Sequence, residues 1–189
     1  MNEIADSLLI KRYLQGDAGA FDRLYERFRL PVFNYIIRQV GEQAVAEDIF
    51  QDVWFRVIRA LEGFDAESHF PGWLFRIAHN RLVDHWRQSG KWPMEALPDE
   101  QEVRQSLTQD IRQFLQDCVD RLKQLIGLLN PDQRDAFLLQ QESGLSLEQI
   151  AEVTGTSRET VKSRLRYAVN RLRDGLQDCD ESTGDSHGR

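Results

Sequence analysis

The chain has 189 residues, of which 41% are hydrophobic and 29% charged, and its formal net charge is −7. This length suits one large or two small domains, and the composition is that of a soluble globular protein, which excludes a largely disordered chain. The acidic balance argues against a protein that binds nucleic acid unaided, because such proteins are usually basic.

The cysteine spacing and the lengths of the apolar runs indicate the cellular compartment. Cys118 and Cys179 fit neither a zinc-ligand spacing nor a disulfide framework. No apolar run approaches the roughly 20 residues of a membrane helix, and the N-terminal stretch MNEIADSLLIKRYLQGD lacks the layout of a signal peptide. We therefore expect a cytoplasmic protein in a reducing environment, with no membrane insertion of its own.

The first predicted elements are helices with aromatic core residues. A short amphipathic helix is predicted over residues 3–15, and a second begins near Asp17. Pro31 either kinks this second helix or occupies the first turn of a new one that ends at Gly41. The apolar residues at helical spacing are interpreted as core. They are Phe21, Leu24, Tyr25, Phe28, Phe33, Ile36, Ile37 and Val40.

Residues 42–61, EQAVAEDIFQDVWFRVIRAL, predict a helix with one apolar stripe. Its other side carries an acidic patch made up of Glu47, Asp48, Gln51 and Asp52. Acids early in a helix and arginines late in it are also what the helix dipole and i,i+4 pairing favour. However, one stripe cannot bury three large rings, so we expect Phe50 and either Trp54 or Phe55 to be exposed beside the acids. Such a face is typical of a protein-binding surface.

A polar loop over residues 66–70 leads through Pro71 and Gly72 to a helix predicted over residues 73–88. The side of this helix that is not apolar displays basic residues, an amide and, depending on how the helix rolls, Trp86. They are Arg76, His79, Asn80, Asp84 and Arg87. Rings that stack on bases and an amide that reads a base edge suit single-stranded nucleic acid.

The remainder of this half holds no pattern of catalytic or metal-binding residues. The sequence contains no zinc site, phosphate loop or nucleophile elbow. We therefore predict no catalytic residue, no metal and no cofactor.

Residues 88–102 combine glycine, prolines and acids, as linkers do. A long amphipathic helix is then predicted over residues 103–129, and a shorter helix from Pro131 to about residue 143.

Residues 146–174, SLEQIAEVTGTSRETVKSRLRYAVNRLRD, predict a helix-turn-helix. Ser146 and Gln149 form a capping box, Gly155 supplies the turn, and Ser157 caps a second helix. The outward side of that second helix is polar and basic, with six Arg or Lys against two acids between residues 156 and 175. Two packed helices with a solvated face would share part of this pattern. The caps, the turn and the charge together favour a helix that reads DNA in the major groove.

In order and spacing, these stretches resemble the conserved regions of extracytoplasmic-function (ECF) sigma factors, within the sigma-70 family of RNA polymerase sigma factors. AEDIFQDVWFRVIRAL resembles the second conserved region, and LQGDAGAFDRLYERF is a shorter match before it. FPGWLFRIAHNRLVDHWRQ resembles the region that melts the promoter and reads its minus-ten element. SLEQIAEVTGTSRETVKSRLRYAVNRLR resembles the fourth region, which reads the minus-thirty-five element, although Thr156 stands where the family often has an aliphatic residue.

The resemblance implies an all-α protein of two small helical domains joined by a flexible acidic linker. Residues 1–90 would bind polymerase, melt the promoter and read the minus-ten element. Residues 91–105 would be the linker, 106–176 the helix-turn-helix domain, and 177–189 a polar tail. The implied partners are core RNA polymerase, promoter DNA and an anti-sigma factor, and the chain would not be an enzyme.

The resemblance also implies three sets of contact residues. Polymerase would be bound by Asp48, Gln51, Asp52 and Phe55. The melted nontemplate strand would be bound by Ser68, His69, Phe70, Arg76, His79, Asn80, Asp84 and Arg87. The upstream element would be bound by Arg158, Glu159, Thr160, Lys162, Ser163 and Arg166.

Two other functions compete with this one. The chain could be an autonomous helix-turn-helix regulator, with residues 1–90 as a sensor or dimerisation domain. A purely structural adaptor would leave the basic face of the last helix without a purpose. Joint binding of DNA with a larger partner best explains why a predicted DNA binder is acidic overall, because its charges are segregated along the chain.

Overall fold

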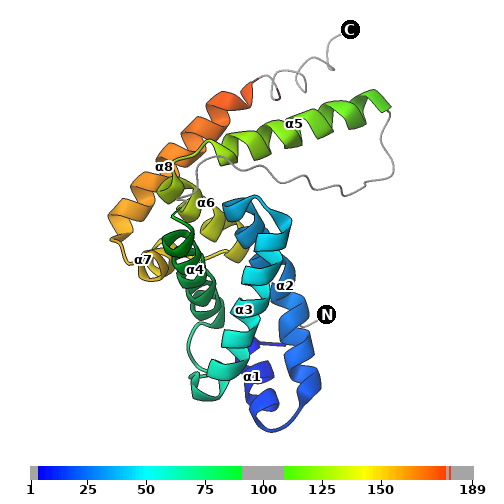
Figure 1. The fold of residues 1–189 in the computed structure, drawn as a ribbon, viewed down its shortest axis with the longest axis vertical. Coiled ribbons are helices and arrows are strands. Elements are labelled where there is room, and N and C mark those ends of the chain that lie inside the picture. The colour runs from blue at the N-terminus through cyan, green and yellow to red at the C-terminus, as the bar shows by residue number, and fades with distance from the viewer. Residues whose placement is uncertain (1–3, 91–108, 178, 180–189) are drawn as a thin grey trace.

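The computed structural model describes residues 4–90, 109–177 and 179, and these ranges fold into helices joined by short turns, without any strand (Figure 1). The elements are α1 (Asp6–Leu14), α2 (Ala18–Val40), α3 (Gln43–Ala60), the short 3₁₀ helix η1 (Leu61–Gly63), α4 (Phe70–Ser89), α5 (Gln109–Gly127), α6 (Pro131–Ser143), α7 (Leu147–Thr154) and α8 (Arg158–Gly175). The predicted all-α fold is confirmed. The predicted linker, residues 91–105, and most of the polar tail lie outside the described residues.

Helices α1 to α4 pack on one another and form what we call the N-terminal group. Aromatic rings bind three of these helices together. The ring of Trp54 in α3 lies between Phe21 and Tyr25 of α2, at centroid distances of 6.0 and 4.8 Å. Phe21 in turn packs on Tyr13 of α1 at 5.2 Å. Each such ring pair contributes about 0.5–1.5 kcal/mol beyond the burial of its area, so the cluster fastens α1 to the rest of the group.

The proline in the second helix does not divide it. α2 runs from Ala18 to Val40 with Pro31 inside, so the alternative of a new helix starting at Pro31 is wrong. Gly41 ends α2 with a φ of 74°, and its N–H donates to the carbonyl of Ile37 at 2.8 Å. Apolar residues on both sides of the proline, such as Leu24 and Ile36, are about 1% exposed or less. Burial of the whole length of α2 therefore offsets the hydrogen bond that proline removes.

Helices α5 to α8 form the C-terminal group, in which α8 packs against α5, α6 and α7. A buried arginine joins α5 to α6. Arg134 is 1% exposed. It donates to the carbonyls of Ile126 at 3.2 Å, of Gly127, and of Leu129 at 3.4 Å, at and just beyond the end of α5. Carbonyls at the end of a helix lack the usual intrahelical donor, and although Ile126 also accepts the N–H of Leu129 at 3.2 Å, the guanidinium supplies the donor that Gly127 needs.

The expectation of two unpaired cysteines is wrong. Cys118 of α5 and Cys179, just beyond α8, form a disulfide across 61 residues of sequence, with their Cα atoms 6.0 Å apart. The spacing could not reveal this pair, because only the packing of α5 beside α8 brings the two residues together.

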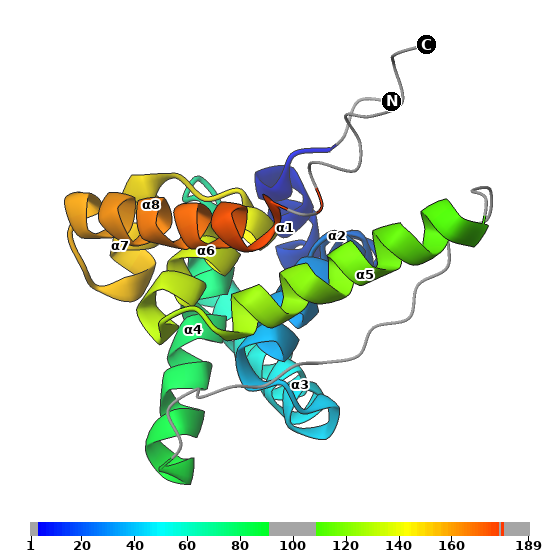
Figure 2. The ribbon, with the colours of Figure 1, turned by 90° about the horizontal axis from the view of Figure 1, so that it is seen from above.

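The two groups also pack against each other. α2 and α4 of the N-terminal group contact α6, and α4 contacts α7. In Figure 1, α1 lies at one end of the molecule and α5 and α8 at the other, with this contact between them. Seen from above, α7 and the N-terminal end of α5 lie on opposite sides (Figure 2). The two groups of helices are therefore in direct contact, which the sequence did not indicate.

Candidate nucleic-acid interface

The helix-turn-helix is formed by α7 and α8, with the caps that the sequence predicts. The Ser146 hydroxyl accepts the N–H of Gln149, while the Gln149 side chain accepts the N–H of Ser146 at 2.9 Å. Gly155 turns the chain with a φ of +65°, a conformation that costs little only for glycine. Ser157 then caps α8 by accepting the N–H of Thr160 at 3.1 Å. Residues close to one another in the sequence therefore form the caps and the turn of this motif.

The outward face of α8 carries the residues expected to bind the upstream element. Its buried side consists of Val161, Leu165, Ala168 and Leu172. The opposite side is exposed at five of the six expected positions and half-buried at Ser163. The exposed positions are Arg158, Glu159, Thr160, Lys162 and Arg166.

Two aspects of this face could not be read from the sequence. Arg158 pairs with Glu148 of α7 and, at 3.0 Å, with Glu159. Hydrogen bonds from its own backbone and from Arg158 lower the pKa of Glu148, and the Glu148 contact raises the pKa of Arg158. Tyr167 is 55% exposed, and its ring lies 5.2 Å from the Arg166 guanidinium. This pair adds a ring to the basic face.

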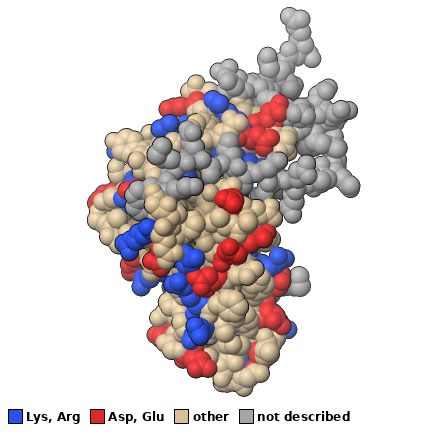
Figure 3. All heavy atoms as spheres, viewed as in Figure 1, with Lys and Arg blue, Asp and Glu red and all other residues tan. Residues whose placement is uncertain are grey.

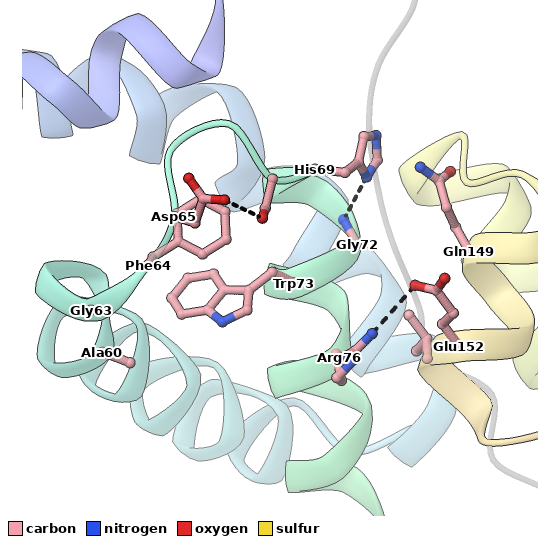
Figure 4. A pocket seen from close by; sticks show the side chains of 12 residues that line it. Ala60, Gly63, Phe64, Asp65, His69, Gly72, Trp73, Arg76, Gln149 and Glu152 are labelled. Atoms are coloured by element: carbon pink, nitrogen blue, oxygen red, sulfur yellow. Dashed lines mark hydrogen bonds and ion pairs between the residues drawn. The ribbon is translucent and has the colours of Figure 1, made fainter.

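The start of α4 borders a cavity of about 510 Å³ that reaches across to α7 (Figure 4). On one side stand Phe64 and Trp73, with ring centroids 4.6 Å apart. His69 caps α4, since its Nδ1 accepts the N–H of Gly72 at 3.1 Å. The opposite wall is formed by Gln149, Glu152 and Val153 of α7. Aromatic, cationic and amide groups thus converge on one hollow, a combination suited to an unstacked base.

The structure divides the residues expected to bind the melted strand. Ser68, His69, Arg76, Asn80 and Arg87 are exposed, and Asp84 lies 3.8 Å from Arg56. Phe70 is not part of an open loop: it is the first residue of α4 and only 2% exposed, because its ring packs on Phe28, Phe64 and Trp73. The placement of Phe70 in the polar loop is therefore wrong. Trp86 also points inward and is 8% exposed.

Two residues of this set contact the C-terminal group, although Arg76 stays exposed. Arg76 lies 3.5 Å from Glu152 of α7. His79 Nδ1 lies 3.1 Å from a carboxylate oxygen of Asp135 in α6. Figure 3 shows basic and acidic side chains gathered across the middle of the molecule, where the two groups meet. The face of α4 that was expected to bind DNA is thus partly covered.

The acidic face of α3 is present, and of the two rings expected to be exposed beside it, Phe55 is exposed and Phe50 is not. Trp54 is 5% exposed and Phe50 is half-buried, so neither supplies the surface ring; Phe55, 66% exposed, does. Asp48 and Gln51 are exposed. Asp52 accepts a hydrogen bond from Arg81 of α4 at 2.6 Å and also pairs with Arg56 at 3.1 Å. One of the expected polymerase contacts therefore also holds α3 to α4.

The described residues contain no group of three or more His, Cys, Asp or Glu side chains that could hold a metal ion. Over the same part of the chain, no helix has both the length and the apolar character needed to cross a bilayer.

Known proteins share both halves of this chain. The family model "Sigma-70 region 2" matches residues 24–91, and "Sigma-70, region 4" matches residues 120–172. The RNA polymerase sigma-H factor of Pseudomonas aeruginosa is 30% identical over 181 residues, which are 91% of this chain and 94% of that protein. The ECF RNA polymerase sigma factor BldN of Streptomyces coelicolor is 31% identical over 87% of this chain but only 63% of its own length.

A solved structure agrees with these matches. The sigma factor RpoE of Bartonella quintana, in complex with the anti-sigma factor NepR, is 25% identical. It superimposes with a TM-score of 0.68, covering 83% of this chain and 96% of that one. Both family regions, the identity over nearly the whole of one relative and the shared helical architecture lead to one conclusion: the chain belongs to the ECF group of the sigma-70 family of RNA polymerase sigma factors.

Proposed function

We propose that this chain directs promoter-specific initiation by placing three separate faces on core RNA polymerase and on promoter DNA. Residues 1–90 would carry the polymerase face and the melted-strand face, and residues 106–176 the face that reads the upstream element. One observation carries the proposal: a capped helix-turn-helix and a second face of aromatic and basic residues lie on different domains of one acidic chain.

The polymerase face is the exposed side of α3. Phe55 stands there beside Asp48 and Gln51. An exposed ring rimmed by carboxylate and amide groups suits a basic, partly apolar surface on a protein partner. This face also accounts for the net charge of −7, because affinity for promoter DNA is then supplied jointly with the polymerase.

The melted strand would be bound by the start of α4 and the loop before it. Arg76 and Arg87 supply positive charge, Asn80 can read a base edge, and Trp73 borders the hollow beside them. Extruding a base costs a few kcal/mol, least where the duplex is already open. A site that holds the extruded base therefore favours the melted promoter over the duplex.

The upstream element would be bound by the outward face of α8 in a major groove. Lys162 and Arg166 would contact phosphates or base edges, and Arg158 would join them once it is released from Glu148. Removing the acid with Glu148→Gln should therefore strengthen promoter binding by the holoenzyme. The slope of log affinity against log salt should become steeper by about 0.9 if one phosphate contact is gained. An unchanged slope would mean that Arg158, which still pairs with Glu159, gains no phosphate contact when Glu148 is neutralised.

The regulation proposed for this chain is capture by an anti-sigma protein in the cytoplasm. Two features support it: the similarity to RpoE, which was solved bound to the anti-sigma factor NepR, and the exposed apolar side chains Phe55 and Ile58 on α3. A protein that covered this face would prevent the chain from docking on polymerase. In this scheme the chain itself performs no catalysis.

A mobility-shift experiment separates the proposal from an autonomous regulator. The chain, core polymerase and the two together are each mixed with promoter duplex, and run-off transcription is measured in parallel. A sigma factor should shift the duplex and start transcripts only when polymerase is present. A specific shift by the chain alone, with no effect on transcription, would favour the autonomous helix-turn-helix regulator.

Two variants test the assignment of the faces. Arg166→Ala should weaken promoter binding by the holoenzyme and leave the affinity for core polymerase unchanged. Asp48→Lys should instead weaken the affinity for core polymerase. Asp52→Lys should also weaken polymerase binding, but it removes the carboxylate that Arg81 contacts. Asp48 is exposed, so its reversal tests the surface with less risk to the fold. Full polymerase affinity of Asp48→Lys would count against the α3 face.

A further inference from the structure

A disulfide encloses the domain that carries the helix-turn-helix. Cys118 lies in the middle of α5 and Cys179 just beyond α8, with their Cα atoms 6.0 Å apart. The region 4 match covers residues 120–172, so one cysteine stands on each side of it. Every residue that we expect to read the upstream element lies inside the covalent ring that this bond closes. The bond therefore acts on the whole domain at once.

The disulfide also holds α5 against the end of α8 where other contacts are looser. Arg121 of α5 donates to the carbonyl of Gly175 at 3.4 Å, which is long for a hydrogen bond. Leu125, one turn further on, packs so closely on Gly175 that a Cβ there would lie 2.5 Å from it. On the other side of the disulfide, Val119 is 46% exposed. The bond from Cys118 thus fastens the part of α5 that lies before its buried residues.

The enclosed domain is small, and small domains bury proportionately less surface when they fold. Its core comes from the buried sides of α5 to α8, among them Leu125, Ile150 and Leu165. A bond across 61 residues restricts the unfolded chain. Loop entropy then favours the folded domain by on the order of a thousandfold more with the bond than without it. That factor is a large part of the whole stability of a small domain.

The pair is open to exchange, because Cys118 and Cys179 are both half-buried and not sealed in the core. One thiolate of a dithiol reductant attacks one of the two sulfurs, forming a mixed disulfide and releasing the other cysteine, which takes up a proton. The second thiolate of the reductant then attacks the reductant's own sulfur in the mixed disulfide. This closes the disulfide of the reductant and releases the second cysteine. Two electrons and two protons have passed from the dithiol to the protein.

Hydrogen peroxide can drive the reverse step. One cysteine thiolate attacks peroxide and becomes a sulfenic acid, with release of water. The other thiolate displaces the hydroxyl group from the sulfenic acid as a second water, which restores the disulfide. A protein that works with RNA polymerase meets the thiol buffer of the cell interior, where lasting disulfides are rare and those that form are usually catalytic or redox-sensing.

We infer that Cys118 and Cys179 form a thiol–disulfide switch on upstream promoter reading, in which the oxidised chain keeps the helix-turn-helix domain folded and the reduced chain lets it open. The inference rests on the proposed function, which assigns the outward face of α8 to the upstream element. Apparent affinity falls in proportion to the fraction of competent domains. If reduction leaves about one domain in ten folded, the contribution of the upstream element to affinity falls about tenfold.

The test uses holoenzyme assembled from core polymerase and the full-length chain, either oxidised or reduced with dithiothreitol. Binding is measured to a promoter that the holoenzyme transcribes and to the same duplex with its upstream element replaced. At about 37 °C, where loss of a native disulfide often abolishes folding of a small domain, reduction should weaken binding to the intact promoter at least about fivefold. The difference should shrink at about 15 °C, near the usual maximum of stability. Binding to the duplex with the replaced element should not change.

Two controls accompany these measurements. The chain with both Cys118→Ser and Cys179→Ser should bind as the reduced chain does, with or without dithiothreitol. Removing the reductant and adding hydrogen peroxide should restore full affinity to the unaltered chain alone. Because this cycle uses the unaltered sequence, it tests the switch even if the double variant folds poorly. Thiol labelling followed by mass spectrometry reports the state of the pair in a series of mixtures of reduced and oxidised glutathione.

Several outcomes would overturn the switch. These are equal affinities of the oxidised and reduced chains at both temperatures, tighter binding after reduction, or an equal response in the double serine variant. A pair that stayed oxidised, or stayed reduced, in every glutathione mixture would overturn it as well, since it could not respond. If the oxidised holoenzyme bound no better with the upstream element than without it, the role proposed for α8 would fail instead.

Discussion

Replacing Arg134 by methionine should destabilise the C-terminal group more than any change to its surface arginines. The side chain is 1% exposed and reaches three backbone carbonyls at the junction of α5 and α6. Burial lowers the pKa of its guanidinium, a sign that the charge is held at some cost in hydration. Methionine can fill much of the volume but cannot donate a hydrogen bond.

The magnitude follows from the hydrogen bonds that are lost. The bond to Leu129 is long, at 3.4 Å, and the Ile126 carbonyl keeps the N–H of Leu129 as a donor at 3.2 Å, so Gly127 is the carbonyl that loses its strong donor. Orphaning a buried carbonyl costs about 1–3 kcal/mol, and losing the charged donor at Ile126 adds about 1–2 kcal/mol. Relief from burying a charge offsets part of this. We expect a net loss of about 2–4 kcal/mol, which lowers the midpoint of thermal unfolding by on the order of 10–20 °C for a domain of this size.

The assay is thermal and urea unfolding followed by circular dichroism, with Arg164→Met as the matched control. Arg164 also joins α6 to α8, through an ion pair with Asp132, but the Asp132 side chain is 64% exposed. Exposed pairs contribute about 1 kcal/mol or less. Equal losses for Arg134→Met and Arg164→Met would refute the reasoning, because burial would then not decide the cost.

Three further predictions concern packing, pH and redox state. In Gly175→Ala the new methyl would lie 2.5 Å from a methyl group of Leu125, so the free energy of unfolding should fall by about 1–3 kcal/mol. Burial, followed by the charge of a neighbouring arginine, lowers the pKa of His85 below its ordinary value of 6.5. The stabilisation that neutral His85 contributes is therefore present above pH 6.5 and lost as the pH falls through its folded pKa. In His85→Gln the free energy of unfolding should therefore decrease less steeply as the pH is lowered. Reducing the Cys118–Cys179 disulfide, which spans 61 residues, should lower the free energy of unfolding, measured with urea, by at most about 4 kcal/mol.

Each of these has a control within the same chain. Gly63→Ala meets no atom within 4 Å and should change stability little, so an equal loss at Gly63 and Gly175 would remove the steric explanation. Cys179→Ser should unfold alike with and without reductant. If His85→Gln loses stability at low pH as steeply as the unaltered chain, the loss of stability at low pH would come from other groups.

Sequence reasoning succeeded where structure is decided by neighbours in the chain. Ser146, Gln149, Gly155 and Ser157 act over three or four residues, and each forms the cap or turn that their spacing predicts. The apolar periodicity likewise gave the buried side of α8 correctly, because one helical face must be buried whatever lies opposite it.

It failed where a residue's surroundings come from distant segments. The roll of α3 decides that Trp54 is buried and Phe55 is exposed, and periodicity over so few turns could not choose between adjacent rings. Phe70 looked like a loop residue, but the histidine cap starts α4 at Phe70 and turns its ring inward. Asp135 gave no signal at all, since its partners are about 56 to 100 residues away in the chain.

The ring cluster around Trp54 bears on how this protein should be divided for study. The region 2 match begins at residue 24, which excludes α1 and the first turns of α2. Yet Tyr13 and Phe21 pack in the chain of rings that covers Trp54, and Leu9 and Ile10 of α1 are 1% and 0% exposed. A fragment cut at the boundary of sequence similarity would expose this apolar surface and tend to aggregate. A recombinant fragment meant to stay in solution should begin upstream of Asp6.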